Sequence, residues 1–84
     1  MQYVYLLKSL KNGRKYIGCT KNLRERVDLH NKGLVVSTKS GAPWRLAYYE
    51  AFSDKYDAFN REKELKTEYT KKRHLILRLK ESLL

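Results

Sequence analysis

The sequence predicts a small α+β domain in which a three-stranded, mainly antiparallel sheet is flanked by helices, in the order β-β-α-β-α-α. Two observations lead to this prediction. Asn12-Gly13 lies between two strand-compatible runs, and Asn-Gly between apolar runs is the strongest short-range signal for a hairpin. The second half carries another strand-like run, followed by apolar residues at helical spacing. We therefore expect 84 residues, 42% of them hydrophobic, to form one folded domain spanning 1–84.

The first half is predicted to form a hairpin and a helix. Residues 2–8 and 14–19 are rich in tyrosine, valine, isoleucine and leucine, which fit a pleated surface, so we expect two strands there. A helix is expected at about 23–31, where apolar residues recur at helical spacing. Thr20 or Asn22 can cap it, because a side-chain oxygen at that position satisfies a free backbone N–H.

The second half is predicted to form one strand and two helices. Residues 34–43 are rich in serine, threonine, glycine and proline and predict a loop. Residues 44–52 predict the third strand, and helices are expected at about 55–66 and 71–83. Simple alternation along this strand gives two sets of side chains, with Trp44, Leu46, Tyr48 and Glu50 on one face and Ala47, Tyr49 and Ala51 on the other.

The charge balance favours a polyanionic partner. Nineteen Lys and Arg against nine Asp and Glu give a net charge of +10, which is typical of nucleic-acid-binding domains. A highly charged, solvated surface without such a partner is the alternative. The cations that we expect to contact nucleic acid are Lys39, Lys66, Lys71, Lys72 and Arg73.

Cysteine content and hydropathy exclude several classes of protein. Cys19 is the single cysteine, so no intramolecular disulfide is possible and nothing favours an oxidising compartment. No run approaches the roughly 18 apolar residues of a membrane span, and the first residues lack a signal-peptide pattern. We expect a cytoplasmic protein without membrane association. The sequence leaves its oligomeric state open.

Four residues of the first half are candidates for a site of phosphate chemistry. The hairpin makes Tyr5 and Tyr16 neighbours, and a phenol near positive charge can position a water or accept its proton. Arg26 and His30 lie four residues apart, on neighbouring positions of one helix face. An arginine near a phosphate stabilises the charge that builds in the transition state. The alternatives are core packing for the tyrosines, a solvated surface charge for Arg26, and a solvated or core position for His30.

Glu62 is the candidate metal ligand of the second half. It falls within the apolar stripe of the helix expected at 55–66, where an unpaired carboxylate is costly. One explanation is a structural salt bridge to Arg61, Lys66 or Arg26. The other is a Mg²⁺ site, because Mg²⁺ often uses one or two carboxylates and keeps several waters.

The order and spacing of these motifs resemble the GIY-YIG endonuclease family. Its first motif corresponds to Tyr3-Val4-Tyr5, in which a tyrosine replaces the leading glycine, and its second motif is intact as Tyr16-Ile17-Gly18. Arg26 and His30 follow on the expected helix, and Glu62 matches the metal-binding glutamate. The resemblance is to the small single-domain branch, which is similar to the N-terminal nuclease domain of the excision repair incision subunit.

The resemblance implies a metal-dependent endonuclease that hydrolyses DNA phosphodiester bonds in DNA repair or processing, with RNA still open as a substrate. By this resemblance, Tyr5 and Tyr16 position or deprotonate the attacking water, and Arg26 stabilises the pentacoordinate phosphate. His30 assists proton transfer or holds a tyrosine, and Glu62 binds Mg²⁺, or Mn²⁺ in its place. The asparagine that follows this glutamate in several members has no match. The alternative is a non-catalytic nucleic-acid-binding or adaptor domain that retains the nuclease fold.

Overall fold

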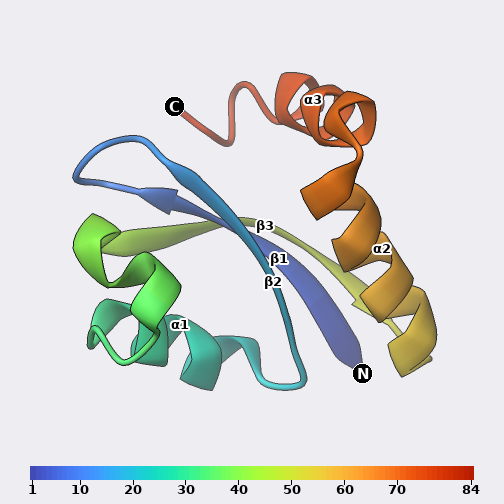
Figure 1. Ribbon diagram of the computed structural model, residues 1–84, viewed down its shortest axis with the longest axis horizontal. Coiled ribbons are helices and arrows are strands. Elements are labelled where there is room, and N and C mark those ends of the chain that lie inside the picture. The colour runs from blue at the N-terminus through green and yellow to red at the C-terminus, as the bar shows by residue number, and fades with distance from the viewer.

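The computed structural model describes residues 1–84 and has the predicted order of strands and α-helices (Figure 1). It adds one 3₁₀ helix, η1, within the segment expected to be a loop. The elements are β1 (Gln2–Ser9), β2 (Lys15–Thr20), α1 (Leu23–Asn31), η1 (Val36–Gly41), β3 (Trp44–Phe52), α2 (Lys55–Thr67) and α3 (Tyr69–Arg78).

The three strands form one antiparallel sheet with β1 in the centre, in the order β2-β1-β3. Gly13 adopts a φ of 75° in the turn between β1 and β2, a conformation that glycine tolerates without strain. Tyr5 lies opposite Gly18 on β2, and Leu7 lies opposite Tyr16. Because side chains alternate along a strand, Tyr5 and Tyr16 share one face of the sheet.

A β-bulge makes the expected alternation along β3 wrong. Leu7 pairs with Leu46 but the preceding Leu6 pairs with Tyr48, so Ala47 is an extra residue without a partner on β1. The side chains therefore change faces within the strand. Leu46 packs beside Tyr5, whereas Tyr48 packs on the opposite face. Simple alternation had put Leu46 and Tyr48 on the same face.

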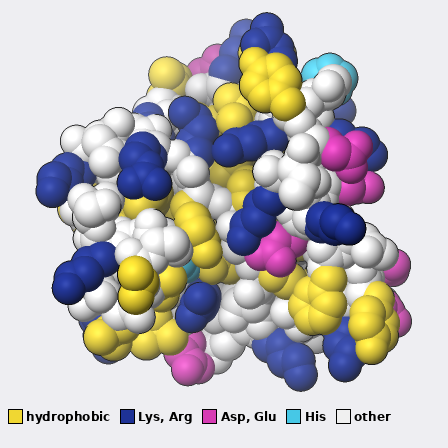
Figure 2. Space-filling model, in the orientation of Figure 1, with side chains coloured by type: hydrophobic (Ala, Val, Ile, Leu, Met, Phe, Trp, Pro, Cys, Tyr) yellow, Lys and Arg dark blue, Asp and Glu magenta, His cyan; other side chains and the backbone are white.

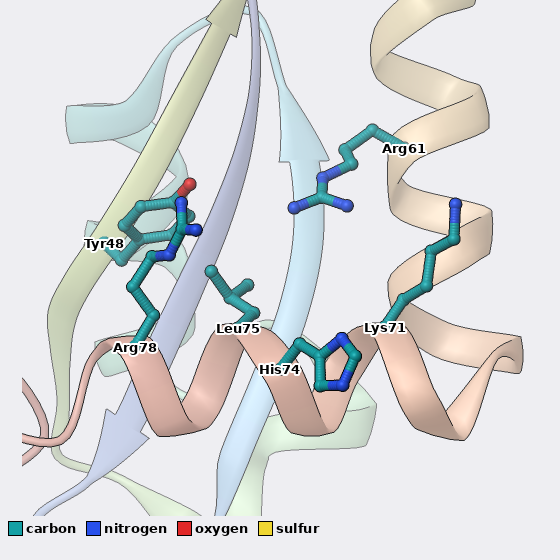
Figure 3. A pocket seen from close by; sticks show the side chains of 6 residues that line it. All are labelled: Tyr48, Arg61, Lys71, His74, Leu75 and Arg78. Carbon is teal, nitrogen blue, oxygen red and sulfur yellow. The ribbon is translucent and has the colours of Figure 1, made fainter.

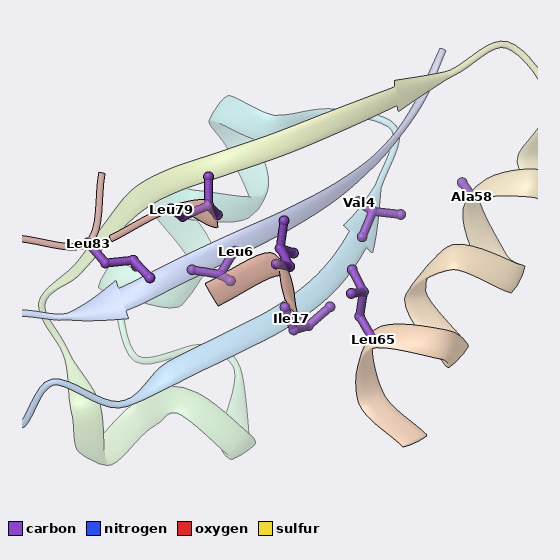
Figure 4. Close-up of a cluster of buried hydrophobic side chains, with 8 residues drawn as sticks. Val4, Leu6, Ile17, Ala58, Leu65, Leu79 and Leu83 are labelled. Atoms are coloured by element: carbon purple, nitrogen blue, oxygen red, sulfur yellow. The ribbon is translucent and has the colours of Figure 1, made fainter. Parts of the chain in front are cut away.

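Helices cover both faces of the sheet (Figure 1). Helices α2 and α3 pack on one face, over the main core, which is shown in Figure 4. The buried residues of this core are Val4, Leu6, Ile17, Ala58, Leu65, Leu75, Leu79 and Leu83. Helix α1 and η1 cover the other face, where Leu23 and Val27 pack against a smaller cluster formed by Tyr5, Leu7 and Trp44.

The helix ends follow local chemistry. Of the two caps expected for α1, Asn22 is the one used, and its Oδ1 accepts a hydrogen bond from the Glu25 N–H at 3.1 Å. Helix α3 ends at Arg78, earlier than expected, yet the N–H of Leu83 still donates to the Leu79 carbonyl at 2.9 Å. This turn keeps both leucines on the core side. None of the α-helices, the longest of which has 13 residues, is long and apolar enough to cross a membrane.

Candidate active site

A buried chain of hydrogen bonds links the sheet to α1 and η1. The Tyr5 hydroxyl lies 2.8 Å from His30 Nε2, and His30 Nδ1 lies 2.7 Å from Thr38 Oγ1. Tyr5, His30 and Thr38 are each at most 1% exposed to solvent. Both ring nitrogens of His30 therefore have partners, which is the arrangement that a buried imidazole needs.

The Thr38 hydroxyl determines which atom donates in each of these hydrogen bonds. The Thr38 hydroxyl donates to the Val35 carbonyl at 3.3 Å, so it accepts a hydrogen bond from His30 Nδ1–H. His30 Nε2 is then the acceptor for the Tyr5 O–H. Burial, and to a smaller degree the charge of Arg26, lowers the pKa of His30 to about 4. The imidazole is therefore neutral at pH 7, as this pattern requires.

Thr38 is held in place by the start of β3. The indole N–H of Trp44 donates to the Thr38 carbonyl at 2.8 Å, and the Trp44 backbone N–H donates to Asn31 Oδ1 at 2.6 Å. Asn31 Nδ2 donates back to the Trp44 carbonyl at 3.1 Å. The end of α1, η1 and the start of β3 are thereby fixed to one another.

Gly18 lets the two strands hold Tyr5 in this position. A Cβ on Gly18 would collide with the Tyr5 hydroxyl and ring, so any side chain there would displace the phenol. Burial is the main reason that the pKa of Tyr5 is raised, and the nearby Arg26 guanidinium opposes it. The buried Tyr5 hydroxyl thus keeps its proton for His30.

Of the two tyrosines at this site, Tyr16 is the one that is partly exposed to solvent. Its ring lies edge-on to His30 at 5.1 Å between ring centroids, and 6.4 Å from the ring of Tyr5. Lys66 Nζ lies 5.5 Å from the Tyr16 ring centroid, over the ring face. The structure thus brings the two predicted tyrosines together, one buried and one partly exposed.

Arg26 and Glu62 approach this group from α1 and α2. The Arg26 guanidinium is close enough to affect the pKa of both Tyr5 and His30. The Glu62 carboxylate acts on the same phenol in the opposite sense, since its charge contributes to the raised pKa of Tyr5. The predicted tyrosines, arginine, histidine and glutamate therefore lie near one another around the paired strands β1 and β2.

Glu62 offers a single carboxylate to a metal. Its Oε2 lies 3.2 Å from Lys66 Nζ, which is one of the salt bridges that the sequence allowed. No group of three or more His, Cys, Asp or Glu side chains is arranged to hold a metal ion. One partly exposed carboxylate fits Mg²⁺, which commonly takes one or two carboxylates and retains waters.

The cations expected to bind nucleic acid do not form one patch. Lys66 lies at the tyrosine site, and Lys39 is exposed on η1. Lys71 lines a hollow with Tyr48, whereas Lys72 and Arg73 lie on another side of α3. Figure 2 shows Lys and Arg side chains scattered over the visible face. The net charge is thus spread over the molecule.

Two members of the site were missed or misjudged in the sequence. Thr38 was part of a predicted loop, and nothing in its neighbourhood marked it as the partner of a histidine eight residues earlier. Lys66 was expected as a nucleic-acid-binding cation and as one possible salt-bridge partner of Glu62, but not as a neighbour of the Tyr16 ring.

Comparison with known proteins identifies the family to which this chain belongs. The sequence profile described as "GIY-YIG catalytic domain" matches residues 1–74. UPF0213 protein CPE1444 of Clostridium perfringens is 40% identical over 67 residues, covering 79% of this chain and 71% of that protein. UPF0213 protein SH2523 of Staphylococcus haemolyticus is 42% identical over 66 residues, covering 77% and 79% of the two chains.

A solved structure gives the same result. The solution NMR structure of UPF0213 protein BH0048 from Bacillus halodurans is 33% identical in sequence to this chain and superposes with a TM-score of 0.57. The match covers 95% of this chain and 86% of that one. Because the profile matches residues 1–74 and the relatives are about 40% identical over most of their length, the chain belongs to the GIY-YIG family.

Proposed function

We propose that this protein is a divalent-metal-dependent endonuclease that hydrolyses DNA phosphodiester bonds. The observation that carries the proposal is the convergence of Tyr16, Arg26 and the Glu62–Lys66 pair around a buried Tyr5–His30 hydrogen bond. A phenol can orient the attacking water, cations stabilise the charge on the phosphate, and a carboxylate can hold a divalent metal. The assignment to DNA repair or processing rests on the family resemblance alone.

The two tyrosines would have different roles. Tyr16 is partly exposed, so its phenol oxygen is the one that would orient the attacking water on the phosphate. Tyr5 is buried, and its hydroxyl is bonded to His30. Tyr5 and His30 would therefore act through Tyr16, by packing against its ring and fixing its position. We assign them positioning roles.

Arg26 and Lys66 would bind the phosphate itself. The pentacoordinate transition state carries more negative charge on its oxygens than the ground state, and fixed cations stabilise that difference. An arginine also offers paired N–H donors that match phosphate oxygens. Lys66 reaches the site over the Tyr16 ring, so that it lies on the side where substrate would approach.

Glu62 would hold Mg²⁺, or Mn²⁺ in its place. The bound metal ion would stabilise the negative charge on the leaving oxygen. The Glu62–Lys66 salt bridge must then open. Its side chains are 25% and 45% exposed, and ion pairs at such a surface contribute only about 0–1 kcal/mol. Exchange of Lys66 from Glu62 to a substrate phosphate is therefore inexpensive.

The test is cleavage of plasmid, single-stranded and branched DNA, and of RNA, with Mg²⁺ or Mn²⁺. Glu62→Gln should lower the cleavage rate by about 10²-fold or more, because the metal loses its only protein carboxylate. Glu64→Gln is the matched control, since Glu64 pairs with Arg61 and Lys71 away from the site. Arg26→Gln, with exposed Arg24→Gln as its control, should show a similar contrast.

The alternative adaptor domain predicts a different pattern. It binds nucleic acid in a salt-dependent manner, with no cleavage under either metal and with binding unchanged by Glu62→Gln. Equal cleavage by wild type and Glu62→Gln would contradict the metal site. Binding without cleavage by every variant would favour the adaptor.

A further inference from the structure

The hollow lined by Lys71 and Tyr48 lies on the opposite face of the sheet from Tyr16. It has a volume of about 270 Å³ and lies between β3, α2 and α3 (Figure 3). Four of its six lining side chains carry nitrogen donors, in contrast to the apolar core beneath it. The lining residues are Tyr48, Arg61, Lys71, His74, Leu75 and Arg78.

The position of these donors follows from the helical repeat of α3. Lys71, His74, Leu75 and Arg78 are spaced at i, i+3, i+4 and i+7, so they share one face of the helix. Leu75 is buried in the main core, and the exposed Lys71, His74 and Arg78 surround it at the rim of the hollow. In Figure 3, Leu75 points from α3 toward the sheet, and Arg61 extends from α2 toward the same space. A cationic stripe therefore borders a cavity.

The carboxylates nearby do not neutralise this stripe. The Glu50 carboxylate accepts hydrogen bonds from Nε and Nη2 of Arg61, each at 3.0 Å. Glu64 is shared, at 3.5 Å from Arg61 Nη1 and 3.4 Å from Lys71 Nζ. Two carboxylates thus face three cations, with Arg78 as the third. The side chains of Arg78 and His74 make no hydrogen bond or ion pair within the chain, so their donors are available.

From this arrangement we infer that the hollow, lined by Lys71, His74 and Arg78, is a binding site for a phosphate group. Arginine presents paired N–H donors that match two phosphate oxygens, while lysine and histidine add donors from other directions. The volume admits a phosphate together with part of a sugar.

This site is separate from the proposed nuclease site. None of its lining residues belongs to the Tyr16 group, although helix α2 contributes Arg61 to the hollow and Glu62 and Lys66 to the nuclease site. The phosphate could belong to a nucleic-acid strand that passes behind the sheet or to a small phosphomonoester. The chemistry recognised is the same in both cases, and the experiment distinguishes the two sources.

The test is a titration of the ¹⁵N-labelled full chain with inorganic phosphate, followed by NMR at neutral pH and constant ionic strength. We expect saturable shifts of the amides of Tyr48 and of residues 71–78. Arg78→Gln should weaken this binding about tenfold, because it removes a charge-assisted bidentate contact. Lys80→Gln removes the same charge from an exposed residue outside the hollow and should leave the affinity unchanged.

Two further ligands identify the source of the phosphate. Shifts with a nucleoside monophosphate, but not with a single-stranded oligonucleotide lacking terminal phosphates, would indicate a small ligand. Shifts of the same amides with the oligonucleotide would indicate a strand. His74→Gln is the second variant if Arg78→Gln fails to fold, and it too should weaken binding. The inference is overturned if no ligand gives saturable shifts, or if Arg78→Gln and Lys80→Gln reduce affinity equally.

Discussion

The two faces of this sheet differ in the kind of side chain that they bury. On the α2 and α3 side, the buried residues of the main core are all apolar. On the α1 side, the apolar cluster is smaller, and Tyr5, His30 and Thr38 are equally buried but joined by hydrogen bonds. One face supplies most of the apolar burial, which leaves the other free to hold a polar network next to a candidate site.

The largest effect should come from the apolar face. Leu6 is 0% exposed at the centre of the sheet, so Leu6→Ala removes buried methyl groups and leaves a cavity. We expect the free energy of unfolding to fall by about 2–5 kcal/mol, measured by urea denaturation. Leu10→Ala is the control, because Leu10 is 61% exposed, and it should change stability by less than about 0.5 kcal/mol. Similar losses from both would show that this face is not the main source of stability.

The polar face should make stability depend on pH. The pKa of His30 is about 4 in the folded chain against 6.5 for an ordinary histidine. Above pH 6.5 the imidazole is neutral in both states, so its contribution is complete. As pH falls from 6.5 to about 4, the unfolded chain takes up the proton and the folded chain does not, so stability falls by up to about 3 kcal/mol.

The histidine contribution is isolated by comparing wild type with His30→Gln in urea denaturation at several pH values. Every other titrating group is common to both proteins. The difference in unfolding free energy should shrink between neutral pH and pH 4. A difference that stays constant over this range would mean that His30 is not held neutral by the fold.

Gly18 is the point where the backbone of β2 accommodates the polar network. Gly18→Ala places a Cβ against the Tyr5 hydroxyl and ring, so Tyr5 must move away from His30. We expect a loss of about 1–3 kcal/mol in urea denaturation and a change in the His30 ring resonances. Gly13→Ala is the control: its φ of 75° makes alanine strained, but its Cβ would meet nothing within 4 Å. Unchanged His30 resonances in Gly18→Ala would contradict the close packing.

The sequence was sufficient for the order of elements because its strongest signals are local. The Asn12-Gly13 turn, the helical spacing of apolar residues and the Asn22 cap each act within a few residues. The faces of β3 could not be obtained in the same way. The bulge at Ala47 is a matter of register between strands distant in the sequence, and alternation within one strand does not reveal it.

The candidate site was predictable to the same extent. The turn pairs Tyr5 with Tyr16, and helix spacing pairs Arg26 with His30. Glu62 joins them only through the packing of α2, which no local pattern reveals. That one tyrosine would be buried and the other partly exposed depends on how α1 and η1 cover the sheet. Thr38 depends on that packing too, since it reaches His30 only through the folded path of η1.

The sharpest comparison of the two faces removes one hydroxyl from each. Tyr5→Phe leaves His30 Nε2 buried without its partner, so we expect a loss of about 1–3 kcal/mol in unfolding free energy. Tyr48→Phe has the same chemical change on the other face. There the hydroxyl donates to Glu50 Oε2 at 2.7 Å, and burial raises the pKa of Tyr48 to about 12.

Tyr48→Phe should nevertheless have the smallest effect of these changes, about 1 kcal/mol or less in urea denaturation. Glu50 keeps its two contacts with Arg61 and remains open to water, so no buried group loses its only partner. The difference in unfolding free energy between the two variants therefore measures the cost of leaving a buried hydrogen-bond acceptor, His30 Nε2, without a partner. Equal losses would show that the two hydroxyls are held alike, and that the contrast between the faces lies in composition alone.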